Sequence, residues 1–263
     1  MNIFQQFIKS LYSPQTIAKF RFQGIGKTIL YVFVLMLITL SISAYQLGSM
    51  ISTVVQQFQY ELKNELPDFE LKNSILTSDL EEPLILNGDG DVIIFDTTGT
   101  FSVADIEEQY SNAIALLEKE AVFVSDGVTE SFRYGELGNL NMTKRSVEEF
   151  TDTIVDLLPL IISIAVMILY LFFTSLKYLG IFVLTIFGLI IRKNTGTVLS
   201  YKQVWILSAY AVTLPTVFFA IIDALSIYIP FAFTLYWIVA VIMLYLIFKE
   251  IPTPKQEEET VEL

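Results

Sequence analysis

The chain has 263 residues, of which 54% are hydrophobic and 14% aromatic, and it contains no cysteine and no histidine. These two absences exclude disulfides, thiol nucleophiles, zinc sites of the usual kind, haem and histidine-based general catalysis within the chain. We therefore predict that the protein is not an enzyme and holds no cofactor and no metal. Long apolar stretches predict instead a helical membrane protein.

The net charge of −12 is concentrated in one segment. Residues 52–153 contain 21 acidic and six basic residues, whereas the remainder contains seven acidic and ten basic residues. An acidic domain repels nucleic acid and anionic lipid head groups. The segment therefore predicts a solvated domain over residues 51–153 without a nucleic-acid partner; a surface for a cation or a basic partner is the alternative.

Residues 1–27 form a leader with four basic residues and no acidic one. Basic residues ahead of a first span place the N-terminus inside the cell. An apolar face recurs at helical spacing and predicts an amphipathic helix that lies on the inner membrane surface and ends near Pro14. That face consists of Phe4, Phe7, Ile8 and Leu11.

The first predicted span is residues 28–50, a run of 23 residues without a charge. A bilayer core of about 30 Å needs roughly 20 apolar residues in a helix. Val54, Phe58 and Leu62 continue the helical stripe until Pro67 ends it. The first helix is therefore expected to continue past the lipid.

Residues 51–153 are predicted to form a compact extracytoplasmic α+β domain. A helix is expected from Ser102, with Asp105 completing a capping box, to about Lys119. Thr143 is expected to cap a last helix that continues into the second span. The predicted strands cover residues 70–76, 92–95, 121–125 and 130–134.

The C-terminal bundle is predicted over residues 154–248, followed by an acidic, disordered tail over 249–263. Its long apolar spans cover residues 154–176, 204–225 and 227–248. The shorter block 178–191 decides the topology: five spans if it crosses the membrane, four if it is a half-helix.

Five basic residues after this block lie outside in the five-span topology and inside in the four-span topology, so charge favours four. Gly180 and Gly188 on one face would let the block pack closely on a neighbour. The predicted class is thus a multi-pass α-helical membrane protein of four spans, possibly five, with an α+β domain between the first two.

Three carboxylates, Asp89, Asp91 and Asp96, are the candidates for a functional surface outside the membrane. Phe95 to Thr100 resembles the phosphorylated Asp-Lys-Thr-Gly-Thr loop of P-type ATPases, but Thr97 replaces the lysine and no nucleotide domain is visible. We predict a tight turn in which Asp96 accepts hydrogen bonds from backbone amides.

Asn87 to Asp91 offers closely spaced oxygen ligands, as a calcium loop does. The twelfth position, where such loops carry glutamate, is Thr98. A hairpin turn is the preferred prediction.

Within the bundle the candidates are Lys177, Pro215 and Asp223. Charged groups buried in mid-span usually mark ion or proton paths. Lys177 is predicted at an inner membrane boundary and Asp223 at the outer end of its span, which disfavours a proton-coupled transporter. Pro215 predicts a kink or break.

Three segments resemble an uncharacterised family of bacterial membrane proteins, DUF1189. They are Ser13–Lys27, Ile93–Gly99 and Thr197–Pro215. The last is also similar to the distantly related Yip-type membrane families. Some DUF1189 members are labelled maltodextrin-utilisation proteins of the YvdJ type, which implies a genetic association with sugar uptake. The resemblance brings no catalytic residues.

The leading hypothesis is a non-enzymatic accessory, scaffold or sensor of the bacterial cytoplasmic membrane, associated with another membrane protein or complex. A transport component with a substrate path in the C-terminal bundle is the second hypothesis. An enzyme that uses carboxylates outside the membrane ranks last, because no base or nucleophile pairing is visible.

Overall fold

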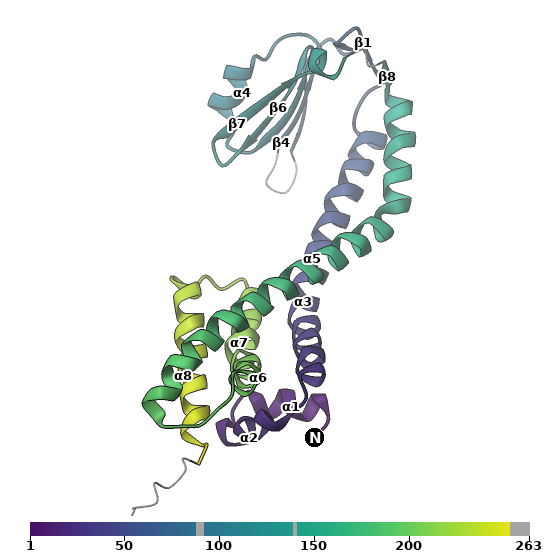
Figure 1. The fold of residues 1–263 in the computed structure, drawn as a ribbon. Coiled ribbons are helices and arrows are strands. Elements are labelled where there is room, and N and C mark those ends of the chain that lie inside the picture. The colour runs from purple at the N-terminus through teal and green to yellow at the C-terminus, as the bar shows by residue number, and fades with distance from the viewer. Residues whose placement is uncertain (88–91, 139–140, 253–263) are drawn as a thin grey trace, which may run out of the picture. The chain divides into compact units, whose positions relative to one another are not determined.

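The computed structural model describes residues 1–87, 92–138 and 141–252 (Figure 1). The chain divides into two compact units. Unit 1 comprises Met1–Ser49 with Ile162–Leu263, and unit 2 comprises Met50–Ile161. Two long helices, α3 (Ile25–Asn64) and α5 (Lys144–Thr195), contribute residues to both units.

Four helical segments are long and apolar enough to cross a membrane among the described residues, which suggests a lipid bilayer as their environment. They are α3, α5, the pair α6 (Tyr201–Ala211) and α7 (Thr213–Ala224), and α8 (Ala232–Lys249).

The separate element predicted over residues 178–191 is not present, because α5 continues through it to Thr195. The only proline inside α5 is Pro159, so no residue after it removes a backbone donor from the helix. Lys177 therefore lies in a helix interior and not between two segments. The predicted half-helix is wrong, and α5 is a single helix of 52 residues.

Unit 1 is built around α6. Every residue from Val204 to Ala211 is buried, so this helix is apolar on all sides and enclosed by its neighbours. The closest neighbours include α2 (Pro14–Lys19), the short helix η1 (Phe20–Phe22) and α8. Gly188 of α5 also approaches α6 and α8, because a Cβ there would lie 2.7 Å from Val204 and 2.9 Å from Leu244. The predicted close packing of this glycine is confirmed.

Helix α1 (Ile3–Ser10) turns its polar side toward unit 1. Gln6 and Ser10 are buried, whereas Phe4 and Ile8 of the predicted apolar face are 63% and 44% exposed. The hydroxyl of Tyr210 donates to Gln6 Oε1 at 2.9 Å, and Gln6 Nε2 donates to Gln23 at 2.9 Å. The amphipathic helix is confirmed, but only part of its apolar face is exposed, because Phe7 packs against the core of unit 1.

Unit 2 contains two sheets (Figure 1). The smaller has the order β2-β1-β8 and the larger β3-β4-β5-β6-β7. All neighbouring strands are antiparallel except β4 and β5, which are parallel and joined through α4 (Val103–Gln109). The strands are β1 (Phe69–Lys72), β2 (Ile75–Ser78), β3 (Leu84–Asn87), β4 (Val92–Asp96), β5 (Ala113–Leu117), β6 (Glu120–Ser125), β7 (Val128–Arg133) and β8 (Met142–Thr143), with a short helix η2 (Tyr134–Leu137) before β8.

The sequence predicted several of these elements and misassigned two. The strands near 92–95, 121–125 and 130–134 are confirmed, as is the Ser102–Asp105 capping box. The predicted strand 70–76 is instead a hairpin, since Asn73 and Ser74 have φ of 53° and 65° and turn the chain.

The predicted helix to Lys119 is also wrong, because it ends at Gln109 and residues 113–117 form β5. In β5, Ala113, Ala115 and Leu117 are buried on one face, a period of two that the helical spacing of larger residues obscured.

The larger sheet has an apolar cluster on each face. Ile94 and Phe95 are adjacent on β4 and lie in different clusters, as expected for a strand. Ile106 of α4 belongs to the cluster of Ile94. Leu62, near the end of α3, is 1% exposed and belongs to the cluster of Phe95. Helix α3 therefore ends inside the core of unit 2.

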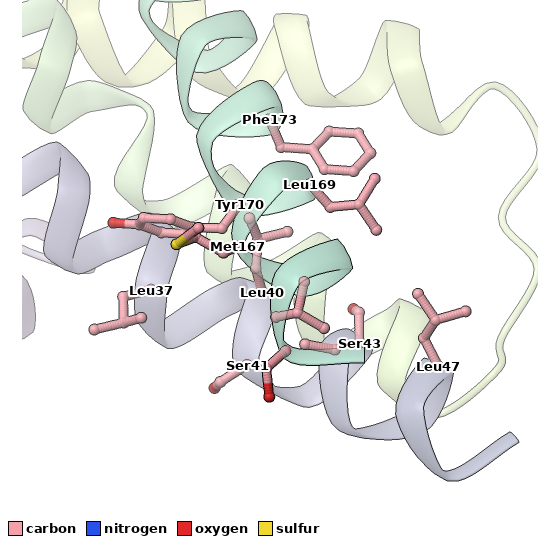
Figure 2. A pocket seen from close by; sticks show the side chains of 12 residues that line it. Leu37, Leu40, Ser41, Ser43, Leu47, Met167, Leu169, Tyr170 and Phe173 are labelled. Atoms are coloured by element: carbon pink, nitrogen blue, oxygen red, sulfur yellow. The ribbon is translucent and has the colours of Figure 1, made fainter. Parts of the chain in front are cut away.

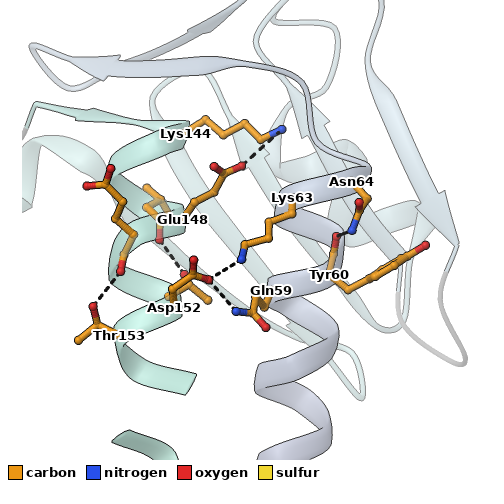
Figure 3. A network of polar contacts seen from close by, with 11 residues as sticks. Gln59, Tyr60, Lys63, Asn64, Lys144, Glu148, Asp152 and Thr153 are labelled. Atoms are coloured by element: carbon orange, nitrogen blue, oxygen red, sulfur yellow. Dashed lines mark hydrogen bonds and ion pairs between the residues drawn. The ribbon is translucent and has the colours of Figure 1, made fainter. Parts of the chain in front are cut away.

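A polar network joins the parts of α3 and α5 that belong to unit 2 (Figure 3). Lys63 Nζ lies 2.6 Å from Asp152 Oδ1, and Gln59 donates to the same oxygen at 2.7 Å. Lys144 donates to the carbonyl of Leu66 at 2.7 Å. The two helices are thus held together by charge as well as by apolar packing.

Candidate functional site

A break between α6 and α7 shapes the candidate site in unit 1. Pro215 lacks a backbone N–H, and its ring clashes with the carbonyl four residues earlier, that of Ala211. Helix α6 ends at Ala211, and α7 begins at Thr213. The predicted break at Pro215 is therefore confirmed. It places Thr213 and Thr216 at the start of α7, where Thr216 Oγ1 donates to the carbonyl of Val212 at 2.6 Å.

Lys177 of α5 forms hydrogen bonds with a side chain next to this break and with one from α8. Its Nζ donates to Thr216 Oγ1 and to the hydroxyl of Tyr236, each at 3.1 Å. The Thr216 and Tyr236 oxygens are themselves 3.1 Å apart. The same ammonium lies 4.8 Å from the centre of the Tyr236 ring, a cation–π distance. Three helices thus meet at one cationic group.

Lys177 lines a cavity of about 380 Å³ formed by α3, α5, α7 and α8. Asp223 lines the same cavity, so two of the three predicted bundle residues share one site. The third, Pro215, is buried and positions Thr216 beside Lys177. Most of the remaining wall is apolar or aromatic, including Met36, Leu40, Phe173, Phe219, Phe233 and Trp237.

The cavity wall also shows where Lys177 lies along the apolar run 28–50. The α3 residues beside it are Met36, Thr39, Leu40 and Ser43, in the middle of that run. The half-buried Lys177 therefore packs beside the middle of the apolar run of α3.

A second cavity, of about 490 Å³, lies between α3 and α5 (Figure 2). The labelled residues Leu37 and Leu47 come from α3, and Met167 and Leu169 from α5. The lining is apolar apart from three serines and the hydroxyl of Tyr170, which donates to the carbonyl of Phe33 at 2.9 Å. Three residues line both cavities: Leu40, Ser43 and Phe173.

In unit 2, Asp96 is fully buried at the end of β4. One of its carboxylate oxygens accepts from the amide of Thr98 at 2.8 Å and from the Thr98 hydroxyl at 2.7 Å. The other accepts from the amide of Phe101 at 2.7 Å. Burial acts to raise the pKa of Asp96, but these hydrogen bonds outweigh it and hold the pKa below its usual value. Asp96 is a structural carboxylate, and the predicted turn is confirmed.

The other two candidates of that surface, Asp89 and Asp91, lie outside the described residues, as does most of the predicted turn at Asn87–Asp91. Among the residues that the structure describes, no group of three or more acidic side chains is placed to hold a metal ion.

Sequence reasoning missed Thr216 and Tyr236. Tyr236 is one of many aromatic residues in a segment where such residues usually mark the membrane interface. The available signal was a threonine directly after a proline in an apolar helix, because Thr and Ser often satisfy backbone groups that a proline frees.

Four apolar helices of membrane-crossing length and a small α+β unit define the class: a helical protein suited to a bilayer, with a polar folded insertion. The chain belongs to the family described as Protein of unknown function (DUF1189), whose sequence model matches residues 4–248. The predicted family membership is thereby confirmed. No curated protein and no solved structure matches the chain.

Proposed function

We propose that this protein is a non-enzymatic accessory, scaffold or sensor of the bacterial cytoplasmic membrane. In this proposal the chain crosses the membrane four times, with the N-terminus inside and residues 51–153 outside. The observation that carries it is that α3 and α5 each continue from one unit into the other without an interruption. Binding of a partner to the outer unit would then bias the membrane bundle through helices and not through flexible linkers.

The topology is tested with single cysteines, because the chain has none of its own. Cysteine at Glu107, an exposed residue of α4, should react with a membrane-impermeant maleimide on intact cells. Cysteine at Asn194, exposed near the end of α5, should react only after the cells are opened. Shielding of position 107 in intact cells refutes the proposed orientation.

Coupling between the units is tested by hydrogen exchange on the purified full chain. Asp96→Ala should loosen unit 2 and also raise exchange in residues 37–47 and 163–173 of unit 1. Inserting Gly-Gly-Ser into both helices outside the predicted spans, after Met50 and after Thr153, should confine the effect of Asp96→Ala to unit 2. An Asp96→Ala effect confined to unit 2 without the insertions contradicts a sensor.

The proposed partner is another membrane protein or complex, and the family resemblance favours a maltodextrin importer. The tagged full-length protein would be purified from native membranes of cells grown on maltodextrin or on glucose. Importer subunits should be enriched over an untagged control. Their absence from both preparations, while the tagged protein is recovered intact, refutes the maltodextrin association.

Transport is a second candidate function, favoured by the cavity at Lys177 and the broken helix at Pro215. Broken helices at membrane depth often line substrate sites. The continuity of α5 removes the half-helix that first pointed to transport. Uptake of labelled maltodextrin into liposomes that contain only this protein would establish this function, and a rate equal to that of empty liposomes would exclude it for that substrate.

A further inference from the structure

The ammonium of Lys177 has one hydrogen-bond donor to spare. An ammonium carries three N–H donors. Two are directed to Thr216 and Tyr236. Within the described part of the chain, no other acceptor is bonded to Nζ, and no carboxylate lies within the 4.0 Å of an ion pair. The charge is therefore solvated by two hydroxyls and a ring but is not neutralised.

An ammonium that no carboxylate neutralises is energetically unfavourable in an apolar helix bundle. A charged lysine among apolar membrane helices is unfavourable, because it loses its hydration. The hydroxyls of Thr216 and Tyr236 reduce that cost without cancelling the charge. Asp223 lines the same cavity, yet its side chain is exposed and forms no ion pair with Lys177. A bound anion would satisfy the third donor and neutralise the charge.

The surroundings of Lys177 favour an anionic ligand that also has a large apolar part. Its cavity shares Leu40, Ser43 and Phe173 with the α3–α5 cavity, in which Figure 2 shows these three residues. The two volumes, about 380 and 490 Å³, are each in the range of small-molecule sites, roughly 300–1,000 Å³. Leu37 and Met167 of the second cavity are more than half exposed, so the groove is accessible from the side of the bundle.

We propose that the two cavities together bind one membrane lipid with an anionic phosphate head group. The phosphate accepts the free N–H of Lys177, and part of an acyl chain occupies the apolar groove between α3 and α5. This site is independent of the proposed function, since an accessory protein and a transporter could each hold such a lipid. Free inorganic phosphate shares the head-group chemistry but gains nothing from the apolar groove.

The test uses the purified full chain, delipidated in a neutral detergent, with native mass spectrometry to count bound lipid. Phosphatidylglycerol and diacylglycerol with identical acyl chains are offered at equal concentration, because diacylglycerol lacks the phosphate. A charge-assisted hydrogen bond is worth about 1.5–3 kcal/mol, so we expect a preference for phosphatidylglycerol on the order of tenfold or more. Lys177→Met should reduce the preference to near unity, and Lys177→Arg should retain it.

Two further variants keep the test decisive if Lys177→Met folds poorly. Lys202→Met removes an exposed lysine and should leave the preference unchanged. Ala44→Phe fills the apolar groove and should lower phosphatidylglycerol binding severalfold with Lys177 intact. Equal binding of the two lipids by the unaltered chain, or an undiminished preference in Lys177→Met, overturns the proposal. Displacement of phosphatidylglycerol by millimolar inorganic phosphate also overturns it, because the site would then be one for a free anion.

Discussion

Lys63 and Asp152, 89 positions apart in the sequence, form an ion pair of 2.6 Å between α3 and α5 (Figure 3). Gln59 donates to the same carboxylate oxygen. The pair lies within unit 2, and Asp152 is about two and a half turns of α5 beyond the strand residue Thr143. It fixes the lateral register of the two helices at the point where both belong to the polar unit.

Removal of this ion pair should cost little stability. The Lys63 and Asp152 side chains are 39% and 47% exposed, so water and salt screen their attraction. We expect Asp152→Ala to lower the free energy of unfolding of unit 2 only slightly. Hydrogen exchange of the amides around Leu62 measures this.

The apolar packing beside the pair should matter more. Leu62→Ala removes a side chain that is 1% exposed and should cost about 2–5 kcal/mol at the same amides. A larger effect for Asp152→Ala than for Leu62→Ala would show that charge, not burial, holds the two helices.

Asp96 should make unit 2 sensitive to acid. Asp96→Ala leaves the amides of Thr98 and Phe101 without their acceptor, so we expect a loss of about 3 kcal/mol at pH 7. Because the pKa of Asp96 is lowered by folding, this contribution is present above the unfolded value, about 3.9, and is lost as the pH falls through the folded value.

The measurement compares exchange of the β4 and β5 amides in the unaltered chain and in Asp96→Ala from pH 7 to pH 3. The difference between the two proteins should shrink below about pH 4. Glu107→Ala is the control on an exposed carboxylate of the same unit. A difference that stays constant to pH 3 would contradict the assigned role of Asp96.

Gly188 should not tolerate a methyl group. A Cβ there would lie 2.7 Å from Val204 and 2.9 Å from Leu244, and both side chains are fully buried. We expect Gly188→Ala to destabilise the bundle by about 1–3 kcal/mol through overpacking. Gly180→Ala is the matched control on the same helix, because its Cβ would meet only Trp237, at 4.0 Å.

Thermal unfolding of the two variants in detergent gives the comparison. Gly180→Ala should be neutral or slightly stabilising, since alanine favours a helix by up to about 1 kcal/mol over glycine. Equal melting temperatures for both variants would mean that α5 moves away from α6 and α8 at no cost.

Elements of the fold could be predicted from the sequence where a residue pattern is compatible with only one local structure. Apolar length identified the helices, and a proline in an apolar run placed the break before Pro215. The prediction failed where context decides. Asn73 and Ser74 adopt positive φ within a run of strand formers, and Ile114 lies at both a helical and a strand spacing. Lys177 was identified as a candidate, but its contacts with Thr216 and Tyr236 depend on how three helices pack, which no local pattern encodes.

Lys177 should reduce the stability of the bundle in which it lies. A charge enclosed by apolar helices and left without an anion costs more than a neutral side chain of similar volume. Without Lys177, Thr216 and Tyr236 can still bond each other across 3.1 Å. We therefore expect Lys177→Met to leave the melting temperature unchanged or to raise it by a few degrees in neutral detergent without anionic lipid.

Addition of phosphatidylglycerol should make the melting temperature of the unaltered chain higher than that of Lys177→Met. The unaltered chain gains stability from a ligand that binds only its folded form, whereas Lys177→Met gains little. Tyr236→Phe is the companion variant, because it keeps the aromatic ring while removing one of the two oxygens that solvate the ammonium, and it should be destabilised by about 1 kcal/mol. A large loss of stability in Lys177→Met under both conditions would identify this lysine as a structural residue, held for its bonds to Thr216 and Tyr236 and not for a ligand.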